Sequence, residues 1–526
     1  MDEKIYILDS TLRDGMQSEG ISFSVDDKLK IVRKLDEFSV DYIEAGNPSS
    51  NPKDIEFFER VAHENLKHSK IVAFGSTKRA NVAACDDANI QALINANTEV
   101  VCVFGKSWRL HVRDILKISD KQNLEIIKDT VSYLKSAGKE VFFDAEHFFD
   151  GYKDDSEYAI QAIKAADDAG ADCIVLCDTN GAAFPYEIEE ITAAAKKAVK
   201  AKIGIHCHND IGMAAANSVF AVRGGARHIQ GTINGIGERC GNANLCTIIP
   251  DLQLKLGYTC VDKEKIEDIT ALSRYVSEIS NIANDKHQPY VGESAFSHKA
   301  GMHVDGVLKN PDTFEHIKPE SVGNSRRILV SEMSGRANVY KFIRQIDPYA
   351  EKDSKDAKKV VDKLKELEYG GYQFEGAESS MELLVRRVLG KYRPFFKLDQ
   401  FKVIISEPPG QEKSASALIK IHVGDSEEIT AAEGEGPVDA LDKALRKALE
   451  RFYPQIATVR LTDYKVRVLE GDRAVESLVR VLVESSDGNN KWSTVGVSRD
   501  IIEASWVALV DSVEYKLLLD AKKMLF

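Results

Sequence analysis

Residues 172–210 read DCIVLCDTNGAAFPYEIEEITAAAKKAVKAKIGIHCHND, two short apolar runs separated by a longer segment rich in Ala, Glu and Lys. Each run has the length of a buried strand and ends in polar residues, whereas the segment between them has the length and apolar spacing of an amphipathic helix. The stretch therefore predicts a strand, a helix and a second strand, which is the unit that builds parallel sheets.

The same alternation starts at the first residues and continues to residue 238. The predicted strands are IYILDST (5–11), DYIEAG (41–46), KIVAFGS (70–76), VVCVFGKS (100–107), EVFFDAEH (140–147), DCIVLCDTNG (172–181), KIGIHCHND (202–210) and HIQGTINGIGE (228–238). Eight evenly spaced units fit a (β/α)8 TIM barrel, which takes about 250 residues. An open, doubly wound sheet is the alternative, but no GxGxxG follows the first strand. We predict an α/β fold built on a TIM barrel.

The first predicted helix follows the first strand, in SVDDKLKIVRKLDEF. Ser24 is placed to cap it, because a serine oxygen can accept from free backbone N–H groups in the first turn. Leu29, Val32 and Leu35 recur at helical spacing and mark the face expected to pack against the strands.

The pattern changes twice after the barrel, which predicts two further parts. Residues 263–392 are helical and highly charged, and the segment SAFSHKAGMHVDGVLKN (294–310) interrupts them. Residues 395–526 hold two similar stretches, at 414–450 and 477–513, in which strands and a Gly-containing turn precede a helix. We expect a barrel at 1–262, helical linker subdomains at 263–392 and a duplicated α+β domain at 395–526.

The composition limits the classes of partner. Lys and Arg total 70 against 83 Asp and Glu, so the net charge is −13. This acidity disfavours binding to nucleic acid, which needs a clustered basic face. No apolar run reaches the roughly 18 residues of a membrane-spanning helix. We expect a soluble, cytoplasmic protein that binds neither nucleic acid nor membrane.

Residues with metal-binding side chains occur at the carboxyl ends of several predicted strands, where the active sites of TIM barrels lie. His206 and His208 alternate on one strand, so both imidazoles face the same side and can bind one cation. Asp14 follows the first strand, and Asn242 follows the eighth. This mixed oxygen and nitrogen set suits Mg²⁺, Mn²⁺ or Zn²⁺ at an open, Lewis-acid site.

Other residues at the same strand ends fit a small carboxylate substrate. Arg13 offers a permanent positive charge, and the Thr179 hydroxyl can bind a carboxylate beside it. Asp144 and Glu146 share one face of the fifth strand, so one is a candidate acid or base and the other a wall of the pocket.

Two motifs resemble a known family. LRDGMQ (12–17) and the segment 203–216, with HCHNDIGMAAA, are similar to the alpha-isopropylmalate, homocitrate and citramalate synthases, also called DRE-TIM metallolyases. The resemblance covers nearly the whole chain. It implies a divalent cation bound by Asp14, His206, His208 and Asn242.

The resemblance also implies roles for residues around the cation. Arg13 and Thr179 hold a 2-oxo acid, with Arg13 counted among the catalytic residues, and Glu146 is a catalytic carboxylate. His303, in GMHVDG, is a catalytic histidine that the partner subunit of a homodimer contributes. Gln17 is the candidate for binding the cofactor, with acetyl-coenzyme A as co-substrate.

Within the family, VCVFGKSW (101–108) is most similar to the longer type of citramalate synthase. This resemblance implies condensation of acetyl-coenzyme A with pyruvate, and feedback inhibition by isoleucine at the C-terminal regulatory and dimerisation domain. Phe74, Phe104 and Asp144 are the candidates for selecting the 2-oxo acid. Relatives often carry Tyr where this chain has Phe314, so a role of that hydroxyl does not transfer.

Several alternatives remain open at this stage. Synthesis of 2-isopropylmalate or homocitrate differs only in the 2-oxo acid, and one methylene changes selectivity by only about 10- to 200-fold. A carbon–carbon lyase on the same barrel is less favoured because of the long regulatory domain. A non-catalytic amino-acid sensor is less favoured because the metal-binding set is intact.

Overall fold

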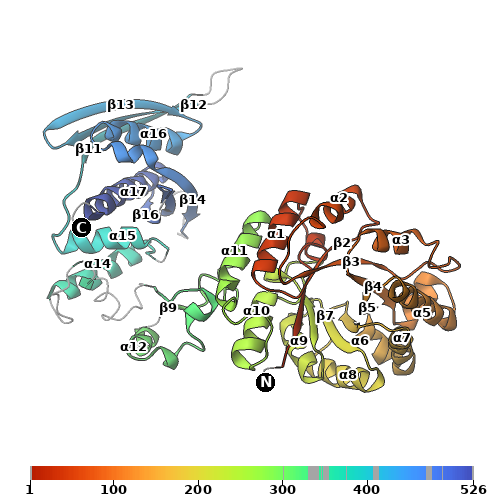
Figure 1. Cartoon of the computed structure of the whole chain (residues 1–526). Helices are drawn as coiled ribbons and strands as arrows, with labels where there is room; N and C mark the ends of the chain where they lie inside the picture. The colour runs from red at the N-terminus through yellow and green to blue at the C-terminus, as the bar shows by residue number, and fades with distance from the viewer. Residues whose placement is uncertain are drawn as a thin grey trace. The chain divides into compact units, whose positions relative to one another are not determined.

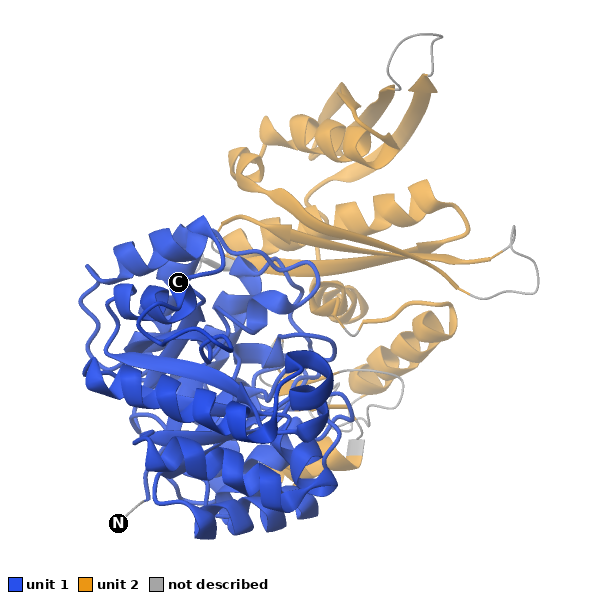
Figure 2. Cartoon of the chain, turned by 90° about the vertical axis from the view of Figure 1, so that its right-hand side faces the viewer, with its two compact units in different colours: residues 1–296, 317–326 blue, residues 297–316, 327–526 orange. Residues whose placement is uncertain are grey.

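The computed structural model describes residues 3–299, 301–329, 343–344, 346, 355–374, 376–406, 414–469, 477–488 and 490–523. The chain divides into two compact units (Figure 2). The first comprises Met1–Phe296 and Ile317–Arg326, and the second comprises Ser297–His316 and Arg327–Phe526. The chain therefore leaves the first unit at Phe296 and returns to it for one short segment.

The first unit contains a closed barrel of eight parallel strands in chain order (Figure 1). β1 pairs with β2 on one side and with β8 on the other, where Ile7 lies opposite Ile229, and this second pairing closes the barrel. The strands are β1 (Tyr6–Asp9), β2 (Tyr42–Gly46), β3 (Lys70–Ser76), β4 (Val100–Lys106), β5 (Glu140–Glu146), β6 (Cys173–Asp178), β7 (Lys202–Cys207) and β8 (His228–Gly231). Each lies within one of the predicted runs, so the predicted TIM barrel is confirmed.

Helices follow the strands and cover the outside of the barrel (Figure 1). They are α1 (Val25–Glu37), α2 (Pro52–Val61), α3 (Ala88–Asn95), α4 (Arg109–His111), α5 (Asp120–Ser136), α6 (Phe148–Asp154), α7 (Ser156–Asp168), α8 (Pro185–Ala198), α9 (Ala214–Arg223), α10 (Leu245–Pro250) and α11 (Ile269–Ile279). α1 shows how local sequence fixes such a helix. The Ser24 side chain accepts from the Asp27 N–H, and the Asp27 carboxylate accepts from the Ser24 N–H.

This reciprocal cap confirms the predicted start of α1, and a cap of this kind contributes about 1 kcal/mol. Leu29, Val32 and Leu35 are buried, as their spacing predicted. They belong to the large apolar core that surrounds the barrel strands. The cap fixes where α1 begins, and the apolar face packs α1 against the barrel. The loop between β1 and α1 is therefore held at the carboxyl end of the strands.

Strand side chains alternate between that outer core and the barrel interior. On β5, Val141 and Phe143 belong to the outer core, whereas Phe142 belongs to a second cluster inside the barrel. Asp144 and Glu146 line a cavity above that inner cluster. The prediction that Asp144 and Glu146 share one face of this strand is therefore confirmed, and Phe142 lies on the same face.

The second unit begins with a short parallel pair, β9 (Ser297–His298) and β10 (Arg327–Ile328). α12 (Gly301–Lys309) lies between these strands in the sequence and carries His303. α14 (Lys355–Tyr369) and α15 (Glu378–Val388) follow, and Val360 and Met381 belong to the apolar cluster in which they pack. These helices precede the repeated part of the unit.

Two similar halves complete the second unit. The first is an antiparallel sheet of β11 (Lys397–Ser406), β12 (Ser414–Val423) and β13 (Ser426–Gly434), followed by α16 (Pro437–Glu450). The second is a sheet of β14 (Arg460–Val468), β15 (Val479–Ser486) and β16 (Lys491–Ser498), followed by α17 (Ile501–Lys523). The predicted repeat is present, but β11 and β14 were missed. Most of their side chains are exposed and many are charged, which obscures the apolar alternation.

Among the helices that the structure describes, none combines the length and the apolar character that crossing a lipid bilayer requires.

Candidate active site at the carboxyl ends of the barrel strands

A cavity of about 210 Å³ opens at the carboxyl ends of the barrel strands, the position of the active site in TIM barrels. Most of the site residues proposed from the sequence meet there. The lining residues are Arg13, Asp14, Gln17, Phe74, Phe104, Asp144, Glu146, Cys177, Thr179, His206, His208 and Glu238. Cys177 and Glu238 are the two that the sequence did not single out.

Asp14, His206 and His208 form a buried group whose ligand atoms all lie within 4.8 Å of one another. The Nε2 atoms of the two histidines are 3.3 Å apart, and Asp14 Oδ2 lies 3.6 Å from His206 Nε2 and 4.0 Å from His208 Nε2. Two nitrogens and one carboxylate oxygen therefore converge on one point. This arrangement suits a divalent cation that keeps free positions for substrate.

Asn242 joins this group through the backbone and through its side chain. A β-bridge links His208 to Asn242, and Asn242 Nδ2 donates to Asp14 Oδ1 at 2.8 Å. Asn242 Oδ1 is buried and has no hydrogen-bond partner among the described residues. Since buried polar atoms are normally paired, this unpaired carbonyl oxygen fits a fourth ligand of the cation.

The environment keeps the three donors in the forms that bind metal. Burial, together with neighbouring His208, lowers the pKa of His206 to about 3. Burial also lowers the pKa of His208. Burial opposes ionisation of Asp14, but Arg13, His206 and His208 outweigh it and hold the pKa of that carboxyl well below its usual value. Near neutral pH the site therefore offers neutral imidazoles and a carboxylate, which metal binding requires.

Arg13 is held in place by two carboxylates and a ring. Its Nε donates to Glu44 Oε2 at 2.7 Å, its Nη1 donates to Asp14 Oδ2 at 2.8 Å, and its Nη2 forms an ion pair with Glu44 Oε2 at 2.6 Å. The guanidinium carbon lies 3.9 Å from the centre of the Phe74 ring. Ser10 Oγ adds a 2.6 Å hydrogen bond to the same Glu44 oxygen.

Glu44 was not predicted as a site residue, although it is fully buried in β2. The signal was present in the sequence, because Glu44 is the one charged residue inside the apolar run YIEAG. A buried carboxylate needs a partner of opposite charge. Arg13 is that partner.

Thr179 and Glu146 both line the cavity, at the ends of the neighbouring strands β6 and β5. Thr179 Oγ1 accepts the His147 backbone N–H at 2.9 Å, which leaves its own O–H free to donate toward the cavity. Glu146 forms an ion pair with Lys106 at the end of β4. Lys106 was not predicted from the sequence, and it is the residue that holds the Glu146 carboxylate.

Asp144 lies deeper and is 4 % exposed. Its Oδ1 accepts a 3.0 Å hydrogen bond from Gln230 Nε2. Burial, with a further contribution from the charge of Glu44, raises the pKa of Asp144 above its usual range. Above it, the Phe74 and Phe104 rings are stacked with centroids 5.4 Å apart and form an apolar wall of the cavity.

His303 belongs to the second unit and does not line the cavity in the barrel. It is an exposed residue of α12, and its ring stacks on Phe314 with centroids 4.2 Å apart. The Phe314 ring itself is 45 % exposed. Both aromatic side chains are therefore on the surface of their unit.

A second cavity adjoins the first and shares Arg13, Gln17 and Phe74 with it. Its volume is about 310 Å³, and it extends toward the loop after β2, where Asn47, Asn51 and other polar residues line it. Lys28 is buried at this cavity and pairs with Asp54 at 2.7 Å. Gln17 thus lies at the junction of the two cavities.

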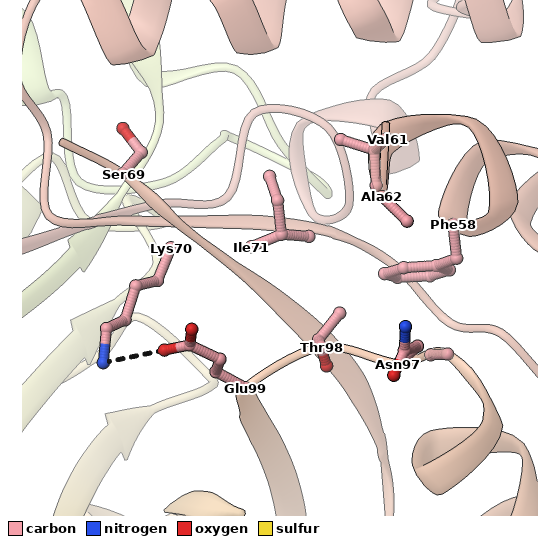
Figure 3. A pocket seen from close by; sticks show the side chains of 10 residues that line it. Phe58, Val61, Ala62, Ser69, Lys70, Ile71, Asn97, Thr98 and Glu99 are labelled. Atoms are coloured by element: carbon pink, nitrogen blue, oxygen red, sulfur yellow. Dashed lines mark ion pairs between the residues drawn. The ribbon is translucent and has the colours of Figure 1, made fainter. Parts of the chain in front are cut away.

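A third cavity, of about 170 Å³, lies at the opposite ends of β3 and β4 (Figure 3). Four of its polar side chains have partners within the protein. Lys70 pairs with Glu99 at 3.2 Å, Ser69 Oγ donates to Val40 O, and Thr98 Oγ1 donates to Val100 O. The amino-terminal face of a TIM barrel usually serves stability, and these contacts fit that role.

Comparison with known proteins agrees with this architecture. The HMGL-like family profile matches residues 4–275, a profile described as homocitrate synthase post-HMGL domain-like matches residues 290–370, and the LeuA allosteric (dimerisation) domain profile matches residues 375–517. The first match alone covers the whole barrel and its candidate site.

Curated relatives match almost the entire chain. The (R)-citramalate synthase of Aquifex aeolicus is 51% identical over 525 residues, which cover 99% of each chain. That of Geobacter sulfurreducens is 52% identical over 516 residues, covering 98% of this chain and 97% of the other. A probable 2-isopropylmalate synthase of Methanopyrus kandleri is 34% identical over 516 residues, covering 98% of each chain. The chain therefore belongs to the family of (R)-citramalate and 2-isopropylmalate synthases, with an HMGL-like barrel followed by a LeuA allosteric (dimerisation) domain.

Proposed function

We propose that this chain condenses acetyl-coenzyme A with pyruvate to give (R)-citramalate and free coenzyme A. The observation that carries the proposal is the convergence of Asp14, His206 and His208 beside Arg13 in a cavity sized for a small 2-oxo acid. The greater identity to the (R)-citramalate synthases of Aquifex aeolicus and Geobacter sulfurreducens than to the probable 2-isopropylmalate synthase of Methanopyrus kandleri supports pyruvate as the acceptor. Synthesis of 2-isopropylmalate or homocitrate is the second candidate.

Asp14, His206, His208 and Asn242 would hold a divalent cation, Mg²⁺, Mn²⁺ or Zn²⁺, which supplies Lewis-acid polarisation of the 2-oxo group. Arg13 would bind the carboxylate of the substrate. Its Nε and Nη1 each donate one hydrogen bond, to Glu44 and Asp14, so N–H groups on its two Nη atoms remain for that carboxylate. The free Thr179 O–H can donate to the other carboxylate oxygen.

A base must remove a proton from the acetyl methyl group so that the resulting carbanion attacks carbon 2 of the acid, whose oxygen then takes up a proton. Water then hydrolyses the thioester, and the thiol of coenzyme A leaves. We propose His303 as the base and Glu146 as the carboxylate that positions it, on the strength of the family resemblance. The assignment is wrong if His303→Ala and Glu146→Ala both keep near-normal turnover.

Acetyl-coenzyme A needs space beyond the cavity that holds the 2-oxo acid. The adjoining 310 Å³ cavity offers such space, and Gln17 lines both cavities. Gln17 is therefore proposed to contact the acetyl thioester.

The LeuA allosteric (dimerisation) domain supports a homodimer, and we propose isoleucine as its effector. We also propose three functional parts, with catalysis at 1–262, a linker with a catalytic loop at 263–392 and regulation at 395–526. This long C-terminal part disfavours a simple lyase. The intact metal-binding set disfavours a non-catalytic sensor.

Thiol release from acetyl-coenzyme A tests the function directly. Protein supplied with Mg²⁺ or Mn²⁺ is assayed with pyruvate, 2-oxoisovalerate and 2-oxoglutarate, each with and without isoleucine, and the product is identified by mass spectrometry and chiral chromatography. Pyruvate-dependent release of (R)-citramalate is expected, with inhibition by isoleucine. Preference for another acid would move the assignment to a sister synthase, and no release with any acid would overturn the synthase assignment.

A further inference from the structure

Gln230 is a fully buried amide inside the barrel, on β8 opposite His206 of β7. Both ends of its side chain are engaged. Oε1 lies 3.0 Å from His206 Nδ1, and Nε2 donates to Asp144 Oδ1 at 3.0 Å. Asp144, Gln230 and His206 thus form a continuous hydrogen-bonded chain from β5 to β7, and none of the three is more than 6 % exposed.

The direction of this chain determines which His206 nitrogen carries the proton. The Asp144 oxygen accepts, so the amide presents N–H groups to Asp144 and its carbonyl oxygen to His206. A carbonyl oxygen can only accept, and His206 Nδ1 must therefore hold the proton. Nε2 is left with its lone pair, and Nε2 is the atom that faces His208 and Asp14.

A reversed amide would have the opposite effect. Its NH₂ group would donate to His206 Nδ1, the proton of the neutral imidazole would move to Nε2, and that atom could no longer bind a cation. The reversed amide would also place its carbonyl oxygen against the Asp144 oxygen. Ionised Asp144 can only accept, so it favours the amide orientation that leaves His206 Nε2 free.

We infer that Gln230 is a positioning residue that fixes the metal-binding tautomer of His206, and that Asp144 fixes the orientation of Gln230. The inference rests on the metal site proposed above. It also gives Asp144 a role that is separate from contact with the 2-oxo acid, because Oδ1 is already committed to Gln230.

The test uses the full-length protein and Co²⁺, whose visible absorption reports both binding and coordination. Gln230→Met removes the acceptor at nearly constant volume, whereas Gln230→Glu retains an acceptor for His206 Nδ1. Asp144→Leu leaves Gln230 in place but removes the group that orients it. Asn217→Leu, which removes a buried amide bonded to Ala183 O, controls for the general effect of losing such an amide.

Gln230→Met is expected to weaken Co²⁺ binding by about 10- to 100-fold, the usual effect of removing a partner of a metal-bound histidine. Gln230→Glu should bind Co²⁺ more tightly than Gln230→Met does. Asp144→Leu should bind Co²⁺ more weakly than the unmodified protein, whereas Asn217→Leu should bind it equally well. In the metal-free protein, ¹⁵N spectra of labelled histidine should show a proton on His206 Nδ1, and Asp144→Leu should add the Nε2-protonated form.

The two ways in which the inference can fail are distinguishable. If the unmodified protein binds no Co²⁺, the proposed metal site is wrong and the inference fails with it. If it binds Co²⁺ and Gln230→Met binds as tightly, the metal site stands and the role of Gln230 is wrong. Should Gln230→Met not fold, unchanged Co²⁺ affinity and His206 tautomer in Asp144→Leu would also overturn the inference.

Discussion

Asn242 and Asp14 lie 228 positions apart in the sequence and are joined by a 2.8 Å hydrogen bond from Asn242 Nδ2 to Asp14 Oδ1. The bond uses the Nδ2 atom of the Asn242 amide, and the buried Oδ1 atom of the same amide has no hydrogen-bond partner among the described residues. Asn242 thus has two roles that a single substitution can test. It orients Asp14, and its oxygen is available to a cation.

Replacing Asn242 by Ala should therefore weaken the binding of Mn²⁺ by at least about 10-fold, because an oriented ligand and an oxygen donor are both lost. Isothermal titration of the metal-free protein with Mn²⁺ measures the effect. Asn180→Ala is the matched control, since Asn180 is an exposed amide of the same rim that donates to Asp150 and does not line the cavity. Equal Mn²⁺ affinity of the two variants would contradict the role of Asn242.

Glu44→Gln should destabilise the protein and weaken the binding of the 2-oxo acid. Glu44 Oε2 accepts a hydrogen bond from Arg13 Nε and forms an ion pair with Nη2, and removal of one partner from a buried ion pair typically costs about 3 to 5 kcal/mol. Arg13 still has Asp14, so the loss should fall toward the lower end of that range. Urea unfolding measures the change in the free energy of unfolding. An increase in the KM for pyruvate would show that Arg13 binds the substrate carboxylate less well.

Glu64→Gln provides the control for Glu44→Gln. Glu64 also pairs with an arginine, Arg33, but on the surface of the barrel, where an ion pair contributes at most about 1 kcal/mol. Equal destabilisation by the two substitutions would show that the buried ion pair with Arg13 stabilises the protein no more than the surface ion pair with Arg33 does.

His228 should make the stability of the barrel depend on pH. It is buried in the barrel interior, packed against the rings of Tyr42 and Phe142, and burial lowers its pKa to about 3. The unfolded chain binds a proton near pH 6.5, whereas the folded chain does not until about pH 3, so the neutral side chain favours folding above pH 6.5. Stability is lost progressively as the pH falls between these two values.

The expected loss from His228 is up to about 1.4 kcal/mol per pH unit within that window. His228→Phe cannot titrate, so the difference between its unfolding free energy and that of the unmodified protein should change with pH by this amount. Urea unfolding at pH 7, 6 and 5 gives the slope of unfolding free energy against pH for each of the two proteins. Parallel pH dependence of both proteins would show that His228 does not contribute.

These residues also show what the sequence could predict. The eight strands and the convergence of the candidate ligands at their ends were predictable, because apolar runs at regular spacing define a barrel and polar residues that end them must meet at one face. Glu44, Gln230 and Lys106 were not predicted. Their roles depend on partners on other strands, and a polar residue within an apolar run does not reveal which partner it has.

The stacked pair of Phe74 and Phe104 leads to a prediction about the choice of substrate. The rings lie 5.4 Å apart at an angle of 21°, and both line the cavity beside Arg13. Phe74 also contacts the guanidinium of Arg13, so its removal would disturb binding of any 2-oxo acid. Phe104 is therefore the better position for changing the size of the pocket alone.

Phe104→Ala should favour 2-oxoisovalerate over pyruvate relative to the unmodified protein, since the isopropyl group can enter the space that the ring vacates. The ratio of the two kcat/KM values is expected to change by about 10- to 200-fold, the range for small differences in apolar volume, and Phe104→Leu should give an intermediate ratio. Thiol release measures both substrates. If kcat/KM falls equally for both acids in both variants, the Phe104 ring does not set the size of the accepted substrate, and the selectivity must arise from other residues of the cavity.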